Sequence, residues 1–245
     1  MNANPVNLKL NKIFTIAECI VAGIFTLIFL TLFILTGACL LRSCICMAWL
    51  LFMLYHLIFK ENKQSYVICL AEILIISPIV LFLSLWAPIM INTHFAFRYP
   101  FQKSYIEIFS GDDTFDYFPD KLPDDVKNYR LDHFPSIMQG DGYTTVSFEA
   151  SDDVLEQYTE LYSAGAVYTC KVRELSGGSV MINENGANNT NKYADVHMSE
   201  SFRKKCSDNA KVYIMYNSET SHRSSYTSAV VIDSEHNLIE FSKIG

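Results

Sequence analysis

The sequence predicts an α-helical membrane anchor of three spans, followed by a soluble α+β domain with an antiparallel sheet and one or two covering helices. Two observations lead to this fold class. Residues 1–92 are dominated by long apolar runs, whereas residues 93–245 consist of short alternating segments separated by Pro, Gly, Asn and Asp. The charge also changes, because the first part has five basic and three acidic residues and the second part has 14 basic and 23 acidic residues. We therefore expect a membrane domain over residues 1–92 and a soluble domain over residues 93–245.

The first apolar run covers residues 13–59 and is interrupted only by the segment LTGACLLRSC. One helix of this length would be about 70 Å long, whereas the hydrocarbon core of a bilayer is about 30 Å thick. The helix should break near Gly37, which loosens it, and Arg42, whose charge is costly at the bilayer centre. The sequence therefore predicts two spans, residues 13–36 and 40–59.

A third span is predicted over residues 66–91, after a short polar run, with Pro78 tolerated as a kink. Three spans place the basic residues of the amino-terminal tail and of the second loop on one side, namely Lys9, Lys12, Lys60 and Lys63. Arg42 then lies alone on the other side. Because basic residues favour the cytoplasmic side, we expect a multi-pass plasma-membrane protein with a cytoplasmic amino terminus and an extracytoplasmic carboxy-terminal domain.

An alternative interpretation treats the first span as a signal peptide. The segment TGAC loosely resembles a bacterial lipobox, in which Cys39 would be lipidated after cleavage. Thr36 stands where such motifs usually have leucine, and the apolar run exceeds the roughly 7 to 15 residues of a signal-peptide core. Retention of residues 1–38 in the intact mass would distinguish the two interpretations.

Three ionisable residues within the predicted spans, Glu18, His56 and Glu72, are candidates for an intramembrane polar cluster. The three-span topology places all of them near the cytoplasmic face, where they could form a proton or cation relay. The alternative is that each side chain reaches the interface or pairs with a neighbouring lysine.

The soluble part contains a series of predicted strands, recognised by alternating or continuous apolar residues between turn signals. They cover residues 104–109, 127–134, 143–150, 166–172, 179–182, 211–216, 226–232 and 238–241. A helix is predicted from Ser151 to about Gly165, and a shorter one near residues 197–205. The longer helix has one apolar face that can cover a sheet, formed by Val154, Leu155, Tyr158, Leu161 and Tyr162.

Only two cysteines, Cys170 and Cys206, lie in the soluble part. In an oxidising compartment they could form a disulfide worth about 3 to 4 kcal/mol. The alternative is a pair of buried free thiols.

The sequence contains no phosphate-binding loop, nucleophile elbow, zinc-protease motif or dinucleotide fingerprint. We therefore predict no catalytic, cofactor-binding or metal-binding residues. The acidic stretch GDDTFDYFPDKLPDD suggests calcium, but its spacing does not fit an EF-hand, and we interpret it as a solvated loop. The acidic charge of the soluble part also argues against nucleic acid as a partner.

The segments FPDKLPDD and YRLDHFPSIMQGDGYTTVSFEAS, within residues 115–151, resemble a pattern in uncharacterised membrane-anchored proteins and lipoproteins of Gram-positive bacteria. The pattern has a Phe-Pro and a Leu-Pro or Ile-Pro before a strand, together with a Gln-Gly turn, here Gln139 and Gly140. The resemblance implies a bacterial envelope protein. The family has no assigned activity or site residues to transfer.

We expect an integral membrane protein that contacts the lipid bilayer and displays an extracytoplasmic binding domain for an envelope protein or a small ligand. One alternative is a small transport or channel subunit that uses the intramembrane cluster. Another is an extracytoplasmic hydrolase whose site is not visible in the sequence.

Overall fold

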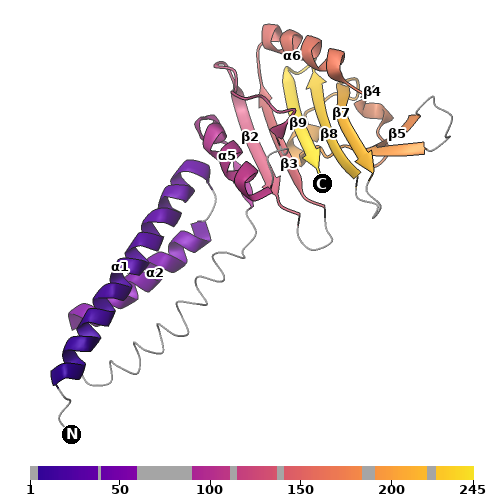
Figure 1. Cartoon of the computed structure of the whole chain (residues 1–245). Coiled ribbons are helices and arrows are strands. Elements are labelled where there is room, and N and C mark those ends of the chain that lie inside the picture. The colour runs from indigo at the N-terminus through magenta and orange to yellow at the C-terminus, as the bar shows by residue number, and fades with distance from the viewer. Residues whose placement is uncertain are drawn as a thin grey trace. The chain divides into compact units, whose positions relative to one another are not determined.

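The computed structural model describes residues 5–37, 40–59, 90–110, 115–136, 141–183, 191–219 and 225–245 (Figure 1). The chain divides into two compact units, Met1–Ala87 and Pro88–Gly245. The second unit begins before residue 93, where the sequence analysis placed the boundary, because Ile91–Thr93 forms strand β1 of its sheet.

The first unit contains two described helices, α1 (Pro5–Thr36) and α2 (Leu40–Phe59). The predicted break at Gly37 is confirmed. This glycine has a φ of 78°, and its N–H donates to the carbonyl of Phe33 over 2.9 Å. A left-handed residue just after the last helical turn is the usual way to end a helix, and glycine adopts it without steric cost.

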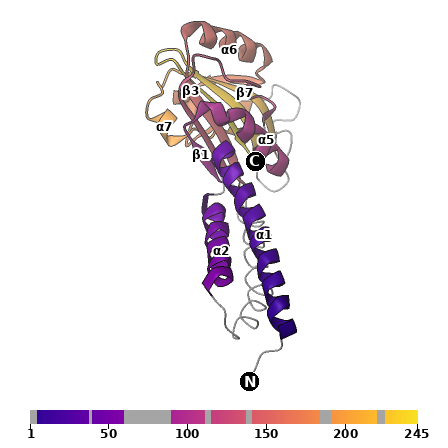
Figure 2. The ribbon, with the colours of Figure 1, turned by 90° about the vertical axis from the view of Figure 1, so that its left-hand side faces the viewer.

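Helices α1 and α2 lie side by side in both views (Figures 1 and 2). They bury an apolar cluster formed by Ala22 and Phe29 from α1 and by Cys46, Trp49 and Met53 from α2. Within the described residues, one helical segment, Thr15–Thr36, is long and apolar enough to cross a membrane, and Arg42–Tyr55 is a shorter apolar segment. The predicted third span, residues 66–91, lies outside the described residues as far as residue 89, and its predicted last residue, Ile91, belongs instead to strand β1.

The second unit is built on a seven-stranded antiparallel sheet with the strand order β1-β2-β3-β9-β8-β7-β4. The bounds are β2 Lys127–Phe134, β3 Tyr143–Glu149, β4 Tyr168–Lys171, β7 Lys211–Glu219, β8 Ser225–Asp233 and β9 Leu238–Ile244. Strands β5 (Ser179–Asn183) and β6 (Asn191–Asp195) form a separate two-stranded sheet. The predicted α+β class with an antiparallel sheet is thus confirmed for the soluble domain.

The prediction of a strand at residues 104–109 is wrong, because this segment belongs to helix α5 (Tyr99–Ser110). Its buried residues Tyr99, Gln102, Tyr105 and Ile106 recur every three or four positions, which is the period of a helix. Pro100 lies in the first turn, where proline is favoured because no intrahelical partner for its N–H is needed.

Helices α5 and α6 (Asp152–Gly165) cover one face of the sheet, which we call the helix face. Tyr158 and Tyr162 of α6 make edge contacts with the ring of Phe241 in β9, with centroids 5.7 and 5.6 Å apart. Tyr99 of α5 packs against Tyr129 of β2 in the same way, at 6.2 Å. The predicted face of α6 is correct except for Leu161, which is 61% exposed.

The opposite face, which we call the hairpin face, carries the β5–β6 hairpin and the short helix α7 (Glu200–Arg203). Val180 and Ala194 of the hairpin and Phe202 of α7 belong to one buried apolar cluster with Val212 and Val231 of the sheet. Helices α5 and α7 accordingly lie on opposite sides of the sheet in Figure 2.

Candidate functional site

The strand register arranges the side chains of the hairpin face in rows across the sheet. From β2 to β4, one row is Arg130, Ser147, Glu240, Val231, Val212 and Cys170. The next row is Asp132, Thr145, Ser242, Ala229, Ile214 and Tyr168. Both rows change from polar to apolar between β9 and β8.

We call the polar half of these two rows the polar layer; it consists of Arg130, Asp132, Thr145, Ser147, Glu240 and Ser242. The layer is buried rather than solvated, since Glu240 is 0%, Thr145 1% and Ser242 2% exposed. Burying polar groups is costly unless they are hydrogen-bonded. The polar layer therefore depends on specific partners.

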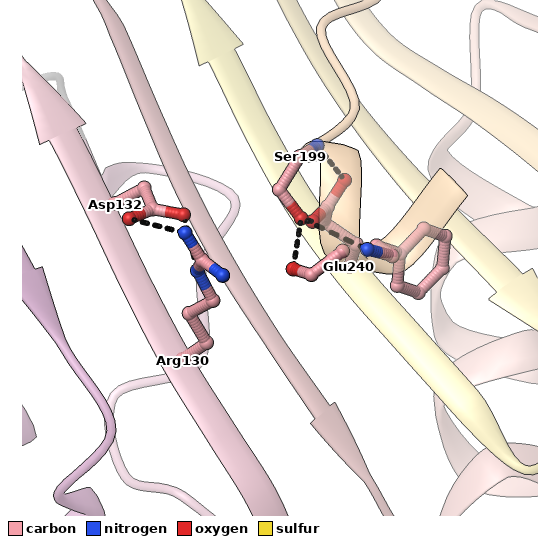
Figure 3. Close-up of polar contacts among 6 residues, drawn as sticks. Arg130, Asp132, Ser199 and Glu240 are labelled. Atoms are coloured by element: carbon pink, nitrogen blue, oxygen red, sulfur yellow. Dashed lines mark hydrogen bonds and ion pairs between the residues drawn. The ribbon is translucent and has the colours of Figure 1, made fainter. Parts of the chain in front are cut away.

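Ser199, in the segment that leads into α7, is the principal partner of Glu240 (Figure 3). Its backbone N–H donates to Oε1 of Glu240 over 2.9 Å, and its hydroxyl hydrogen-bonds Oε2. The same hydroxyl accepts from the N–H of Phe202 over 3.4 Å, which makes Ser199 the amino-terminal cap of α7. Ser199 thus links helix α7 to the carboxyl group of Glu240 through hydrogen bonds.

Burial raises the pKa of Glu240 to about 8, against its ordinary value of 4.5. The hydrogen bonds from Ser199 lower this pKa in part, Asp132 raises it further, and Arg130 lowers it. At neutral pH the side chain is therefore mainly the uncharged carboxylic acid.

Arg130 and Asp132 lie two residues apart on β2 and point to the same face (Figure 3). The Nε and Nη2 atoms of Arg130 donate to the two carboxylate oxygens of Asp132 over 2.6 and 3.3 Å. A fork of this kind is the strongest form of ion pair available to arginine. Because a guanidinium has five N–H groups, three donors remain beyond this fork.

His197 lies next to this pair and stacks on Tyr143, with ring centroids 3.9 Å apart. Tyr143 in turn stacks on Phe134 of β2 at 5.9 Å. Burial lowers the pKa of His197, and the negative charge of Asp132 opposes the shift. The aromatic stack links β2 and β3 to the segment that precedes Ser199.

A cavity of about 430 Å³ opens beside the polar layer, where β2 begins and β3 ends. Arg130 and Ser147 of the layer reach its wall, together with Ser201 and Lys205 from the α7 region. His94, Glu149, Phe202 and Leu238 are also part of the lining.

A backbone irregularity shapes the mouth of the cavity. The β2–β3 register shifts between Lys127 and Arg130, and Asn128 has a φ of 50°. Its side-chain amide donates to Oε2 of Glu149 over 2.6 Å, while Nζ of Lys205 donates to Oε1 over 3.3 Å. Bulges of this kind redirect side chains and are frequent beside binding and active sites.

The buried pair of Glu240 and Ser199 differs chemically from the groups that line the cavity. Glu240 and Ser199 are sealed from solvent, so a substrate cannot reach them, and they organise the site rather than contact a ligand. The groups that line the cavity carry N–H and O–H donors, with two basic side chains, Arg130 and Lys205, and one carboxyl group, Glu149. This set suits a small polar ligand that bears a negative charge.

The structure separates the residues that the sequence analysis singled out. Glu18 is buried in α1, at 6% exposure. The side chain of His56 and the whole of Glu72 lie outside the described part of the chain, so the intramembrane cluster stays a prediction. Cys170 belongs to the apolar cluster of the hairpin face and Cys206 packs against it; both are free thiols, and burial raises their pKa values to about 11 and 12.

Sequence reasoning missed the polar layer. The strongest signal for it was a single acidic residue, Glu240, in the middle of the apolar strand LIEF. Alternation alone would place such a residue in solvent, because nothing in the local sequence shows that a distant serine covers it.

The comparisons with known proteins found no match for this chain, whether to a family model, to a curated protein or to a solved structure.

Proposed function

We propose that this chain is a membrane-anchored receptor whose α+β domain binds a small anionic ligand in the cavity beside the polar layer. In this proposal the amino-terminal part forms a three-span anchor in the plasma membrane of a bacterium, and the domain is displayed outside the cytoplasm. The resemblance of residues 115–151 to membrane-anchored proteins of Gram-positive bacteria supports this location.

The observation that carries the proposal is the cavity of about 430 Å³ with Arg130 and Lys205 in its wall. Residues 93–245 have nine more acidic than basic residues, and this cavity brings together two basic side chains, Arg130 paired with Asp132 and Lys205 paired with Glu149. Cations that line a cleft raise the local concentration of anions and orient them.

The nature of the ligand follows from the donors. Arg130 keeps three N–H groups beyond its bonds to Asp132, and Lys205 is 56% exposed at the side chain. Planar guanidinium groups recognise carboxylates and phosphates, and the hydroxyls of Ser147 and Ser201 can satisfy their remaining oxygens. A ligand with a carboxylate or phosphate group fits this set.

Calorimetry with the full chain in detergent micelles tests the proposal, using inorganic phosphate, a phosphorylated sugar and a dicarboxylate, with the parent sugar as an uncharged probe. We expect at least one anionic probe to bind, and Lys205→Gln to weaken it roughly tenfold, or about 1.4 kcal/mol. The matched control is Lys211→Gln, since Lys211 is exposed on β7 away from the cavity. Equal loss in both variants, or binding of the uncharged sugar alone, would contradict an anion site.

The location has its own test. A cysteine introduced at the exposed Ser163 of α6, in a variant without native cysteines, should react with a membrane-impermeant maleimide in intact cells. Labelling only after lysis would place the domain in the cytoplasm and overturn the proposed orientation.

A second candidate function is a small transport subunit, which is favoured by the burial of the Glu18 carboxyl group in α1. Here Glu18→Gln should abolish ion or proton flux in proteoliposomes. A receptor role predicts that the same variant binds the anionic probe as tightly as the native chain.

A further inference from the structure

We propose a divalent metal site at the β8–β9 turn, formed by Asp233, Glu235 and His236, with the thiol of Cys206 beside it. This site goes beyond the binding function proposed above, because none of the four residues lines the cavity. It also departs from the sequence analysis, which predicted no metal-binding residues.

The three side chains already converge. One ligand atom from each of them lies within 4.8 Å of the other two. Among the described residues, these three form the group of possible metal ligands that meets this distance condition. Nδ1 of His236 is 2.8 Å from Oδ2 of Asp233. Two donors on a tetrahedral ion with bonds of about 2.0 Å lie about 3.3 Å apart, so an ion can replace this hydrogen bond with a small displacement.

The carboxylate of Asp233 is oriented in advance by the backbone. Its side chain is fully buried, Oδ2 accepts from the N–H of Ser207 over 2.7 Å, and Oδ1 accepts from the N–H of Glu235 over 3.0 Å. Hydrogen bonds from neighbouring groups to a metal-binding side chain fix the orientation of that side chain around the ion. Each oxygen still has a lone pair free once the contact with His236 is exchanged for the ion.

The other two ligands come from the turn itself. Glu235 and His236 are both exposed at the surface, His236 by 53% of its side chain, so an ion can reach them without unfolding the hairpin. Asn209, from a separate segment, donates a long hydrogen bond of 3.5 Å to Oε1 of Glu235. The exposed side chains of Glu235 and His236 let an ion enter from solvent, and the buried carboxylate of Asp233 holds it in a fixed position.

Cys206 brings a thiol to the same carboxylate from a segment 27 residues away in the chain. Cys206 directly precedes Ser207, whose backbone N–H donates to Oδ2 of Asp233, and its thiol donates to the carbonyl of Ser207 over 3.5 Å. A set of imidazole and carboxylate donors with a thiol nearby suits Zn²⁺ rather than Ca²⁺ or Mg²⁺, which take oxygen ligands.

Binding replaces the contact between His236 and Asp233 with one bond from each residue to the ion. His236 then binds the ion as the neutral imidazole, with the lone pair of Nδ1 on the ion and its proton on Nε2. No oxidation or reduction is involved, so the ion alone is sufficient as a probe.

The test uses the full chain in detergent micelles, with the five cysteines of residues 1–92 replaced by serine so that only Cys170 and Cys206 remain. After treatment with a chelator, Zn²⁺ is titrated against a chromogenic indicator, and Co²⁺ is titrated as a spectroscopic probe. We expect one equivalent of Zn²⁺ to bind and visible Co²⁺ bands of a site with low coordination number. His236→Asn and Glu235→Gln should each weaken binding about tenfold or more.

The matched control is Glu174→Gln, which changes an exposed residue outside the cluster and should leave the affinity unchanged. Equal binding by His236→Asn and the native chain, or no binding at all, would overturn the site. A thiolate-to-cobalt charge-transfer band that disappears in Cys206→Ser would support the fourth donor. Its absence from the native chain would overturn the role of Cys206.

Discussion

Both halves of the hairpin face are buried, but one half consists of apolar side chains and the other of polar side chains. On β8 and β7 the rows contain Val231, Val212, Ala229 and Ile214, all at most 2% exposed, and they are covered by the β5–β6 hairpin. On β2, β3 and β9 the same rows contain Arg130, Asp132, Ser147 and Glu240. The first half needs only shape complementarity, whereas the second needs matched hydrogen bonds.

This difference indicates what each half is for. Replacing buried polar or ionic groups by well-packed apolar ones is often neutral or stabilising, so stability alone does not favour a polar layer. The cavity opens at the polar half and shares Arg130 and Ser147 with it. We infer that the apolar half holds the fold and that the polar half positions the groups of the binding site.

The largest effect is expected in the apolar half. Ile214→Ala removes a side chain that is 0% exposed and should reduce the free energy of unfolding by about 2 to 5 kcal/mol, because it leaves a cavity in a packed cluster. Urea unfolding of the chain in micelles, followed by circular dichroism of the strands, measures this change. The control is Ile108→Ala on α5, where the side chain is 76% exposed and the loss should be small. Comparable losses of unfolding free energy in the two variants would contradict the view that the apolar half of the hairpin face stabilises the fold.

The polar half should make stability depend on pH through Glu240. Its pKa is raised to about 8 in the folded chain, so above its ordinary pKa the unfolded chain binds fewer protons, and stability falls as pH rises toward 8. Burial lowers the pKa of His133 to about 4 and also lowers that of His197, and both effects oppose the trend below pH 6.5. Between pH 6.5 and 8 the loss from Glu240 should therefore be visible, at about 2 kcal/mol.

Glu240→Gln removes this titration while keeping a side chain of the same shape. We expect the variant to show no decline in stability between pH 6.5 and 8, when unfolding is measured at several pH values in that range. Glu156→Gln, at an exposed position of α6, should retain the decline of the native chain. A flat profile in the native chain would show that Glu240 is not held protonated.

How far the sequence predicts this domain depends on whether the cause of each element is local. Strands β2, β3, β8 and β9 were predicted because alternating residues record which side faces a core. Helix α6 was predicted from Ser151 and its acidic first turn, although the hydroxyl of Ser151 makes no capping hydrogen bond. There Asp125 accepts from the N–H of Ser151 over 3.1 Å.

The failures share a non-local cause. The segment SYIEIF alternates like a strand when read by itself, but its helical period becomes visible only together with Tyr99 and Gln102 upstream. Strand β6, NKYAD, is polar in sequence and exists because it pairs with β5 and covers the sheet. The burial of Glu240 depends on Ser199, 41 residues away in the chain, so no window of sequence could have shown it.

A smaller effect is expected when Ser199 is truncated. Ser199→Ala removes the hydroxyl bond to Glu240 and the cap of α7, which should reduce stability by about 1 to 2 kcal/mol at pH 6.5. Since the side-chain hydrogen bond from Ser199 lowers the pKa of Glu240, its loss should raise that pKa further and extend the decline in stability to higher pH, while the backbone N–H bond to Oε1 remains. Ser163→Ala, at an exposed position of α6, provides the control, and both variants are measured by urea unfolding across the same pH series.

The smallest effect on stability, and the sharpest division of roles, is expected at the cavity wall. The pair of Lys205 with Glu149 spans 3.3 Å, with the two side chains 56% and 28% exposed, and pairs of this kind contribute about 0 to 1 kcal/mol. Lys205→Gln should therefore unfold at nearly the same urea concentration as the native chain, even though we expect it to weaken an anionic ligand roughly tenfold. A large loss of stability would mean that Lys205 supports the fold through Glu149 and the bulge at Asn128. Unchanged stability with weakened binding would instead show that Lys205 serves ligand binding. It would then share this role with the residues of the polar half, which we infer position the binding site rather than stabilise the sheet.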